Sequence, residues 1–100
     1  MSVQTDRPII IAVDDDPAVL SAVRGDLRRQ YGEHYRIVVA PGGAEAVEVL
    51  KELKLRSSPL ALVVSDQRMP EVSGFEVLRA ARELFDDVRT VLLTAYADTE

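Results

Sequence analysis

Two groups of carboxylates follow apolar runs in this sequence, and their spacing suggests phosphate chemistry. Asp14, Asp15 and Asp16 come directly after the run IIIAV, and Asp66 comes directly after LALVVS. Like charges as close as Asp14 and Asp15 repel each other unless a cation compensates them, and Mg²⁺ prefers oxygen ligands of this kind. A single carboxylate such as Asp66 can attack phosphorus and form an acyl phosphate. We therefore expect a site that holds a phosphoryl group and Mg²⁺.

Each of these residues also has a structural interpretation that involves no ligand. Aspartate favours helix N-termini, where its side chain accepts hydrogen bonds from the first free amides. We assign Asp16 to this capping role because Pro17 follows it, and proline fits the first turn of a helix. Asp66, standing before a turn, could equally bond its own backbone. Thr94, which ends another apolar run, has a hydroxyl that can donate to a phosphoryl oxygen, but it says little by itself.

Composition limits the other classes of function. The chain has 100 residues, of which 47% are hydrophobic, and this fits one small domain over 1–100. The net charge of -5, with basic residues scattered along the chain, argues against direct binding to nucleic acid. The chain has no cysteine and a single histidine, so a bound metal would be held by oxygen. Without a long apolar run or a signal-peptide pattern, we expect a cytoplasmic location and no contact with a membrane.

Four strands are predicted, at 9–13, 35–40, 60–64 and 88–94. The first and third are continuous apolar runs, as in parallel strands that are covered on both faces. Because helical patterns separate the strands, the order βαβαβαβ predicts an α/β fold, a doubly wound parallel sheet with helices on both faces. The carboxyl ends of parallel strands meet at one rim, so the acids and Thr94 should converge there.

The predicted helices are marked by caps and by apolar stripes. Ser73 and Glu76 have the spacing of a capping box, which places the start of the third helix. The stripes have helical spacing and consist of Val19, Leu20, Val23, Leu27 and Tyr31 in the first helix and Ala46, Val47, Leu50 and Leu53 in the second.

The segments VDDDP, VVSDQRMPEVSG and VLLTAYAD resemble the three motifs of the response-regulator receiver domain of bacterial two-component signalling, and the resemblance spans nearly the whole chain. It implies a flavodoxin-like fold with the strand order 2-1-3-4-5. It also implies that Asp66 is the phosphoacceptor and Thr94 the switch hydroxyl. Asp14, Asp15, Asp66 and the backbone carbonyl of Arg68 would bind Mg²⁺. A histidine kinase would be the partner that supplies the phosphoryl group.

The sequence departs from this family at its end. It stops at Glu100, where a receiver would begin its fourth helix, so we expect order 2-1-3-4 with the fifth strand and last helices missing. In the family that strand carries a lysine that contacts the phosphoryl group, whereas the lysines here, Lys51 and Lys54, belong to the second helix. The strand at 88–94 would become an exposed edge, apolar on both faces, and we expect self-association through it.

Three functions stay open at this point. The first is a phosphoacceptor module, itself no enzyme, that relays its signal to an output domain or protein missing from this chain. The segment DLRRQYGEHYRIV is similar to receivers fused to thioredoxin-reductase-like flavoproteins, while phosphodiesterase and DNA-binding outputs are open too. The second is a pseudo-receiver that acts as an interaction module without phosphorylation. The third, a phosphatase with an aspartyl nucleophile, would need an acid two residues after Asp66, where this chain has Arg68.

Overall fold

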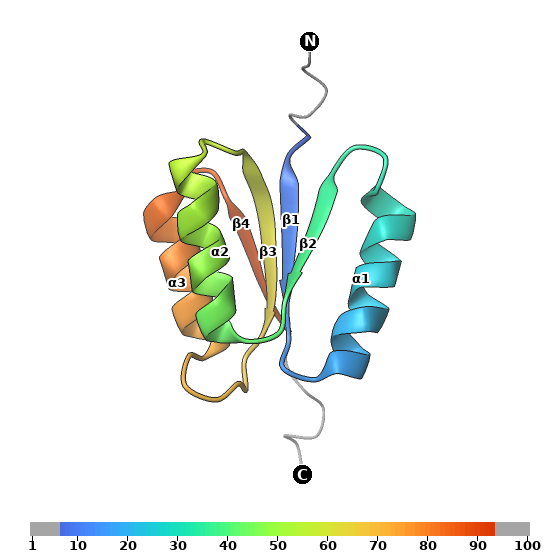
Figure 1. Cartoon of the computed structure of the whole chain (residues 1–100), viewed down its shortest axis with the longest axis vertical. Coiled ribbons are helices and arrows are strands. Elements are labelled where there is room, and N and C mark those ends of the chain that lie inside the picture. Colours follow the sequence, from blue (N-terminus) through green and yellow to red (C-terminus); the bar gives the residue numbers. More distant parts are fainter. Residues whose placement is uncertain (1–6, 94–100) are drawn as a thin grey trace.

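Four parallel strands form a single sheet in the order β2-β1-β3-β4 (Figure 1). The computed structural model describes residues 7–93. Within this range the strands are β1 (Ile9–Val13), β2 (Arg36–Ala40), β3 (Leu60–Asp66) and β4 (Arg89–Leu93), and the helices are α1 (Pro17–Tyr31), α2 (Gly43–Leu55) and α3 (Gly74–Leu84). The predicted parallel α/β fold and the strand order 2-1-3-4 are confirmed.

The third strand is longer than the sequence pattern predicted. It continues past 64 through Ser65 and Asp66, because parallel pairing with β4 continues as far as Asp66 opposite Leu93. Asp66 is therefore the last residue of β3. The other strands begin or end within one residue of their predicted bounds, and Thr94, the predicted end of the fourth, lies outside the described residues.

Both predicted helix caps are present. The side chain of Asp16 accepts from the backbone N–H groups of Ala18 and Val19, and Pro17 opens the first turn of α1. At α3, the hydroxyl of Ser73 accepts from the N–H of Glu76 while the Glu76 carboxylate accepts from the N–H of Ser73. These contacts satisfy amides that have no partner inside the helix, so both helices begin where the sequence indicated.

The main core lies between the sheet and the helix pair α2 and α3, which cover one face together (Figure 1). Two residues of the predicted α2 stripe, Ala46 and Leu50, are fully buried in it. Removing this much apolar surface from water is the main source of stability in a domain of this size. The buried members are Ile9, Ile11, Val13, Ala40, Ala46, Leu50, Leu60, Val63, Val77, Leu78 and Ala81.

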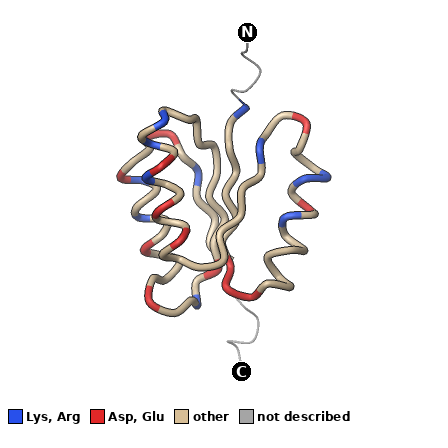
Figure 2. The backbone as a smooth tube through the Cα atoms, viewed as in Figure 1, with Lys and Arg blue, Asp and Glu red and all other residues tan. Residues whose placement is uncertain are grey.

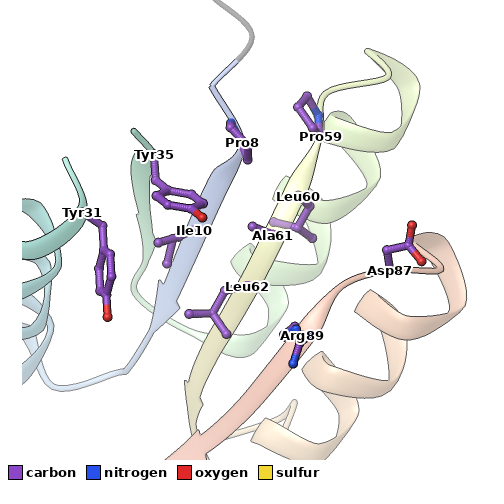
Figure 3. A pocket seen from close by; sticks show the side chains of 10 residues that line it. All are labelled: Pro8, Ile10, Tyr31, Tyr35, Pro59, Leu60, Ala61, Leu62, Asp87 and Arg89. Atoms are coloured by element: carbon purple, nitrogen blue, oxygen red, sulfur yellow. The ribbon is translucent and has the colours of Figure 1, made fainter. Parts of the chain in front are cut away.

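The opposite face of the sheet is covered less completely. Helix α1 lies alone on it among the described elements and has no buried residue (Figure 1). Three residues of its predicted apolar stripe, Leu20, Val23 and Leu27, are half-buried. The other two, Val19 and Tyr31, are 41% and 45% exposed. Beside α1 a hollow of about 510 Å³ opens against Ile10 and Leu62, with the rings of Tyr31 and Tyr35 on its wall (Figure 3).

The edge strand β4 is covered on one face by α3. Its Leu92 packs against the main core, and its Thr90 hydroxyl accepts a hydrogen bond from Arg82 of α3 at 3.1 Å. The strand is at the edge of the described sheet and has apolar side chains on both faces, as predicted, and α3 covers one of these faces. The other face is open, with Val91 and Leu93 exposed to 44% and 36%. No helix within residues 7–93 is both long and apolar enough to cross a membrane.

Candidate functional site

One carboxylate oxygen from each of Asp14, Asp15 and Asp66 lies within 4.8 Å of the other two. Asp14 and Asp15 follow β1 directly and Asp66 ends β3, and these two strands are parallel neighbours in the sheet. Figure 2 shows the acidic segments together at the lower end of the sheet, where β1 runs into α1 and β3 ends. The fold thus brings Asp66 beside Asp14 and Asp15, which lie far before it in the sequence, as the alternation of strands and helices predicted.

The three carboxylates differ in burial and in what holds them. Asp14 is buried, with 7% of its surface exposed, and its Oδ1 accepts from the backbone N–H of Asp16 at 2.9 Å. Its own N–H donates to the carbonyl of Ala40 at 3.3 Å. Asp66 is half-buried and Asp15 is exposed. Asp14 is therefore held in place by these hydrogen bonds, while Asp15 faces the solvent, from which a ligand would enter.

The oxygen set fits a hard divalent cation. Mg²⁺ binds oxygens at about 2.1 Å in octahedral geometry, which places neighbouring ligands about 3 Å apart and opposite ligands about 4 Å apart. The observed oxygens lie within 4.8 Å of one another, which is close to this range, so the donor set suits such an ion. Without a cation, three carboxylates at this separation repel one another.

Asp16 has a different position from the other acids of its run. Its Oδ1 accepts from Ala18 N at 2.9 Å and from Val19 N at 3.3 Å, so the side chain is turned to the start of α1. This confirms its assignment as a helix cap. The carboxylate of Asp14 also bonds the local backbone, because it accepts from the amide two residues further on.

The loop that follows Asp66 is held against the start of α3. Gln67 accepts two hydrogen bonds there, one on its carbonyl from Gly74 N at 3.1 Å and one on its side-chain Oε1 from Phe75 N at 2.9 Å. The hydroxyl of Ser65, which is fully buried, donates to the Asp66 carbonyl at 2.9 Å. These supporting residues were missed from the sequence, because a glutamine beside an aspartate gives no indication of a partner eight residues away.

The outer part of the same loop contacts the start of α2. Glu71 has a φ of 69°, and Val72 N donates to the Pro70 carbonyl at 2.7 Å, which closes a three-residue γ-turn. A Cβ on Gly43 would stand 2.2 Å from the Val72 carbonyl oxygen, so only glycine permits this approach. A hollow of about 220 Å³ between the two loops reaches Asp15 and so gives the acids a second open side.

The remaining predicted site residues are less well placed by the structure. Arg68 is exposed, and the role of its backbone carbonyl as a metal ligand stays a prediction. Thr94 and the residues after it lie outside the described residues. The two lysines belong to α2, where the ammonium group of Lys54 stands 5.7 Å from the centre of the Phe85 ring.

Comparisons with known proteins show which proteins this chain resembles. The family model of the response regulator receiver domain matches residues 10–100. The response regulator MprA of Mycobacterium leprae is 41% identical over 87 residues, and the hydrogenase transcriptional regulatory protein HoxA of Cupriavidus necator is 31% identical over 91 residues. A crystal structure of a receiver domain protein from Clostridium thermocellum superposes with a TM-score of 0.74 at 21% identity, which shows the shared fold.

The lengths of the matched proteins differ from that of this chain. The matched segment is 86% of this chain and 34% of MprA, and 91% of this chain and 17% of HoxA. For the Clostridium thermocellum structure, the match covers 91% of this chain and 68% of the other. The chain thus corresponds to one segment of each of the two longer regulators.

Proposed function

This chain belongs to the response regulator receiver domain family, a family of signalling modules in two-component systems, and we propose that it accepts a phosphoryl group on Asp66. One observation carries the proposal: the carboxylates of Asp14, Asp15 and Asp66 meet within 4.8 Å at the carboxyl ends of two neighbouring strands. In open α/β sheets this rim is where ligands bind.

In the proposed reaction an oxygen of Asp66 attacks the phosphorus of the donor. A new O–P bond forms, the bond from phosphorus to the leaving group breaks, and the leaving group takes the electron pair. The backbone beneath Asp66 is fixed by pairing with Leu93 and by the Ser65 hydroxyl, so the nucleophile is held ready for in-line attack. The product is an acyl phosphate on this side chain.

The other acids would hold the cofactor. We propose that Asp14, Asp15 and Asp66, with the backbone carbonyl of Arg68, bind Mg²⁺. When bound, the ion neutralises the charge of the phosphoryl oxygens and of the carboxylates around them. Asp14 contributes a ligand that the Asp16 amide already orients, and exposed Asp15 completes the set from the solvent side. The hydroxyl of Thr94 would donate to a phosphoryl oxygen, as the family resemblance implies.

We propose a histidine kinase as the physiological donor and an output domain or protein outside this chain as the recipient of the signal. Small phosphodonors such as acetyl phosphate would serve in vitro. The proposal places the module in the cytoplasm, where such a kinase presents its phosphohistidine. The nature of the output, including the similarity to receivers fused to thioredoxin-reductase-like proteins, stays a prediction.

The test is intact mass spectrometry after incubation with acetyl phosphate and Mg²⁺. We expect a gain of one phosphoryl mass in the unmodified chain and none in Asp66→Ala. Asp86→Ala is the matched control, because this exposed aspartate lies in the turn before β4 at the opposite end of the sheet, and it should be labelled normally. Equal labelling of the Asp66→Ala chain would contradict the proposal.

A second candidate function is that of a pseudo-receiver, which would use the same surface for protein contacts without phosphorylation. Lys51 and Lys54 both belong to α2, and the Lys54 ammonium group lies over the Phe85 ring, so the described part of the chain shows no lysine beside the three acids. A folded chain that gains no mass in the labelling experiment would favour this function over the first.

A further inference from the structure

We propose that Gln67 is a positioning residue that joins the phosphoacceptor strand to helix α3 and so fixes the direction of Asp66. The proposal rests on the proposed function of that site. Gln67 directly follows Asp66 and precedes Arg68, the two residues from which the site is expected to take a carboxylate and a backbone carbonyl. A residue between them controls both if it is itself held rigidly.

Gln67 is held by an unusual pair of contacts. The first amides of a helix have no partner inside it and must find acceptors elsewhere. At α3, Gly74 N donates to the Gln67 backbone carbonyl at 3.1 Å, Phe75 N donates to its side-chain Oε1 at 2.9 Å, and Glu76 N donates to Ser73 Oγ at 3.3 Å. Two of the three acceptors thus come from one residue that lies outside the helix and beside Asp66.

The backbone of Gln67 also touches the helix directly. A Cβ on Gly74 would stand 2.8 Å from the Gln67 Cα and 2.3 Å from the Asp66 carbonyl oxygen. That carbonyl receives the Ser65 hydroxyl at 2.9 Å. The peptide group between residues 66 and 67 is therefore enclosed by the start of α3 and by a buried hydroxyl. The hydrogen bond from Phe75 N to Gln67 Oε1 ties this loop to α3 through a side chain.

The chemical type of the side chain fits this role. An acceptor is required for Phe75 N, and a carboxylate would supply one, as Glu76 does for Ser73 N. A carboxylate here would add a fourth negative charge beside three acids that already lie within 4.8 Å of one another. The neutral carboxamide provides the acceptor and adds no charge. Losing it should let residues 66–68 sample more conformations and reduce the fraction in which the oxygens face one ion.

The experiment compares Gln67→Met with Ser73→Ala. Methionine has a similar length and lacks the carbonyl acceptor, while Ser73→Ala removes a cap from the same helix without touching residue 67. Both should lower the melting temperature, because each removes one acceptor for a helix amide. Gln67→Met alone should weaken Mg²⁺ binding, measured by calorimetry, by about three- to tenfold, the equivalent of one net hydrogen bond. It should slow labelling by acetyl phosphate to a similar degree and speed hydrogen exchange at the Phe75 amide.

Gln67→Glu is the rescue variant, because its carboxylate can accept from Phe75 N. It should restore slow exchange at that amide. If Gln67→Met does not fold, Gln67→Asn, which keeps the amide but shortens its reach, takes its place with the same expected losses.

The role of Gln67 is refuted if Gln67→Met loses stability as Ser73→Ala does but keeps the Mg²⁺ affinity and labelling rate of the unmodified chain, since Gln67 would then be a helix cap and nothing more. Failure of the proposed function has a different result: the unmodified chain itself would not be labelled. The Mg²⁺ titration and the Phe75 exchange rate would still decide the role of Gln67.

Discussion

Gly74 at the start of α3 lies so close to Asp66 that a Cβ on Gly74 would stand 2.3 Å from the Asp66 carbonyl oxygen. A backbone atom cannot move aside as the end of a long side chain can. The start of α3 and the end of β3 are therefore packed as one unit. The position of the candidate nucleophile thus depends on a helix that contributes none of the three aspartates of the site.

Gly74→Ala should separate these two elements. We expect a loss of about 1 to 3 kcal/mol in the free energy of unfolding, typical of overpacking in a tight contact. Labelling of Asp66 should fall as well, because the shift acts on its own peptide group. Chemical denaturation and intact mass after acetyl phosphate treatment measure the two effects. Normal stability of this variant would show that the contact can relax.

Gly25→Ala is the matched control for this substitution. Gly25 lies inside α1, where an added Cβ would meet only the Arg29 side chain at an ordinary 3.6 Å. Alanine is the better helix former, so the free energy of unfolding should rise by about 0.5 to 1 kcal/mol. Labelling of Asp66 should not change, because Gly25 lies more than one helical turn beyond the start of α1, where Asp14 and Asp15 are found.

Asp16→Ala tests the division of labour among the three consecutive acids. The side chain of Asp16 accepts from Ala18 N and Val19 N, so its loss should cost about 1 kcal/mol of stability. Affinity for Mg²⁺, measured by titration calorimetry, should stay within about twofold, since one surface charge is largely screened at physiological salt. A loss of Mg²⁺ binding as large as that of an Asp15 variant would make Asp16 a ligand.

Asp15→Asn should have the opposite pattern. Asp15 is exposed and one of its oxygens lies within 4.8 Å of oxygens of Asp14 and Asp66, so neutralising it relieves repulsion in the metal-free protein. We expect a small rise in melting temperature without Mg²⁺ at low ionic strength. Mg²⁺ at one hundred times its dissociation constant should raise the free energy of unfolding of the unmodified chain by about 2.7 kcal/mol, and in the variant this gain should shrink or vanish. A full Mg²⁺ effect in the variant would exclude Asp15 from the site.

Self-association through the strand predicted at 88–94 stays a prediction. Strand β4 is at the edge of the sheet, with Val91 and Leu93 exposed on the side of α1. Unpaired strand edges with apolar side chains invite pairing with another chain. We expect light scattering after size exclusion to show a dimer that Val91→Lys abolishes. Leu55→Lys, which changes an exposed leucine of α2, should have no effect, and a monomeric unmodified chain at high concentration would contradict the prediction.

Several features of this protein were determined by local sequence alone. Asp16 before Pro17, and Ser73 three residues before Glu76, marked two helix starts correctly, because a cap and its amides are neighbours in the chain. The apolar runs of β1 and β3 identified buried parallel strands for a similar reason, since burial on both faces needs no information beyond the run itself. From these elements the meeting of Asp14, Asp15 and Asp66 at one rim of the sheet followed, whereas the strand order was implied by the resemblance to the receiver family.

Tertiary structure decided the features that depend on partners distant in sequence. The end of β3 was set by its pairing with β4, and the exposure of Tyr31 by the absence of a second helix beside α1 among the described elements. The roles of Gln67 and Gly74 depend on close contacts between the end of β3 and the start of α3. The types of these two residues do not indicate which residues they will contact. Periodicity and capping report what a residue does to its chain neighbours, and only the packed structure shows what lies against it from elsewhere.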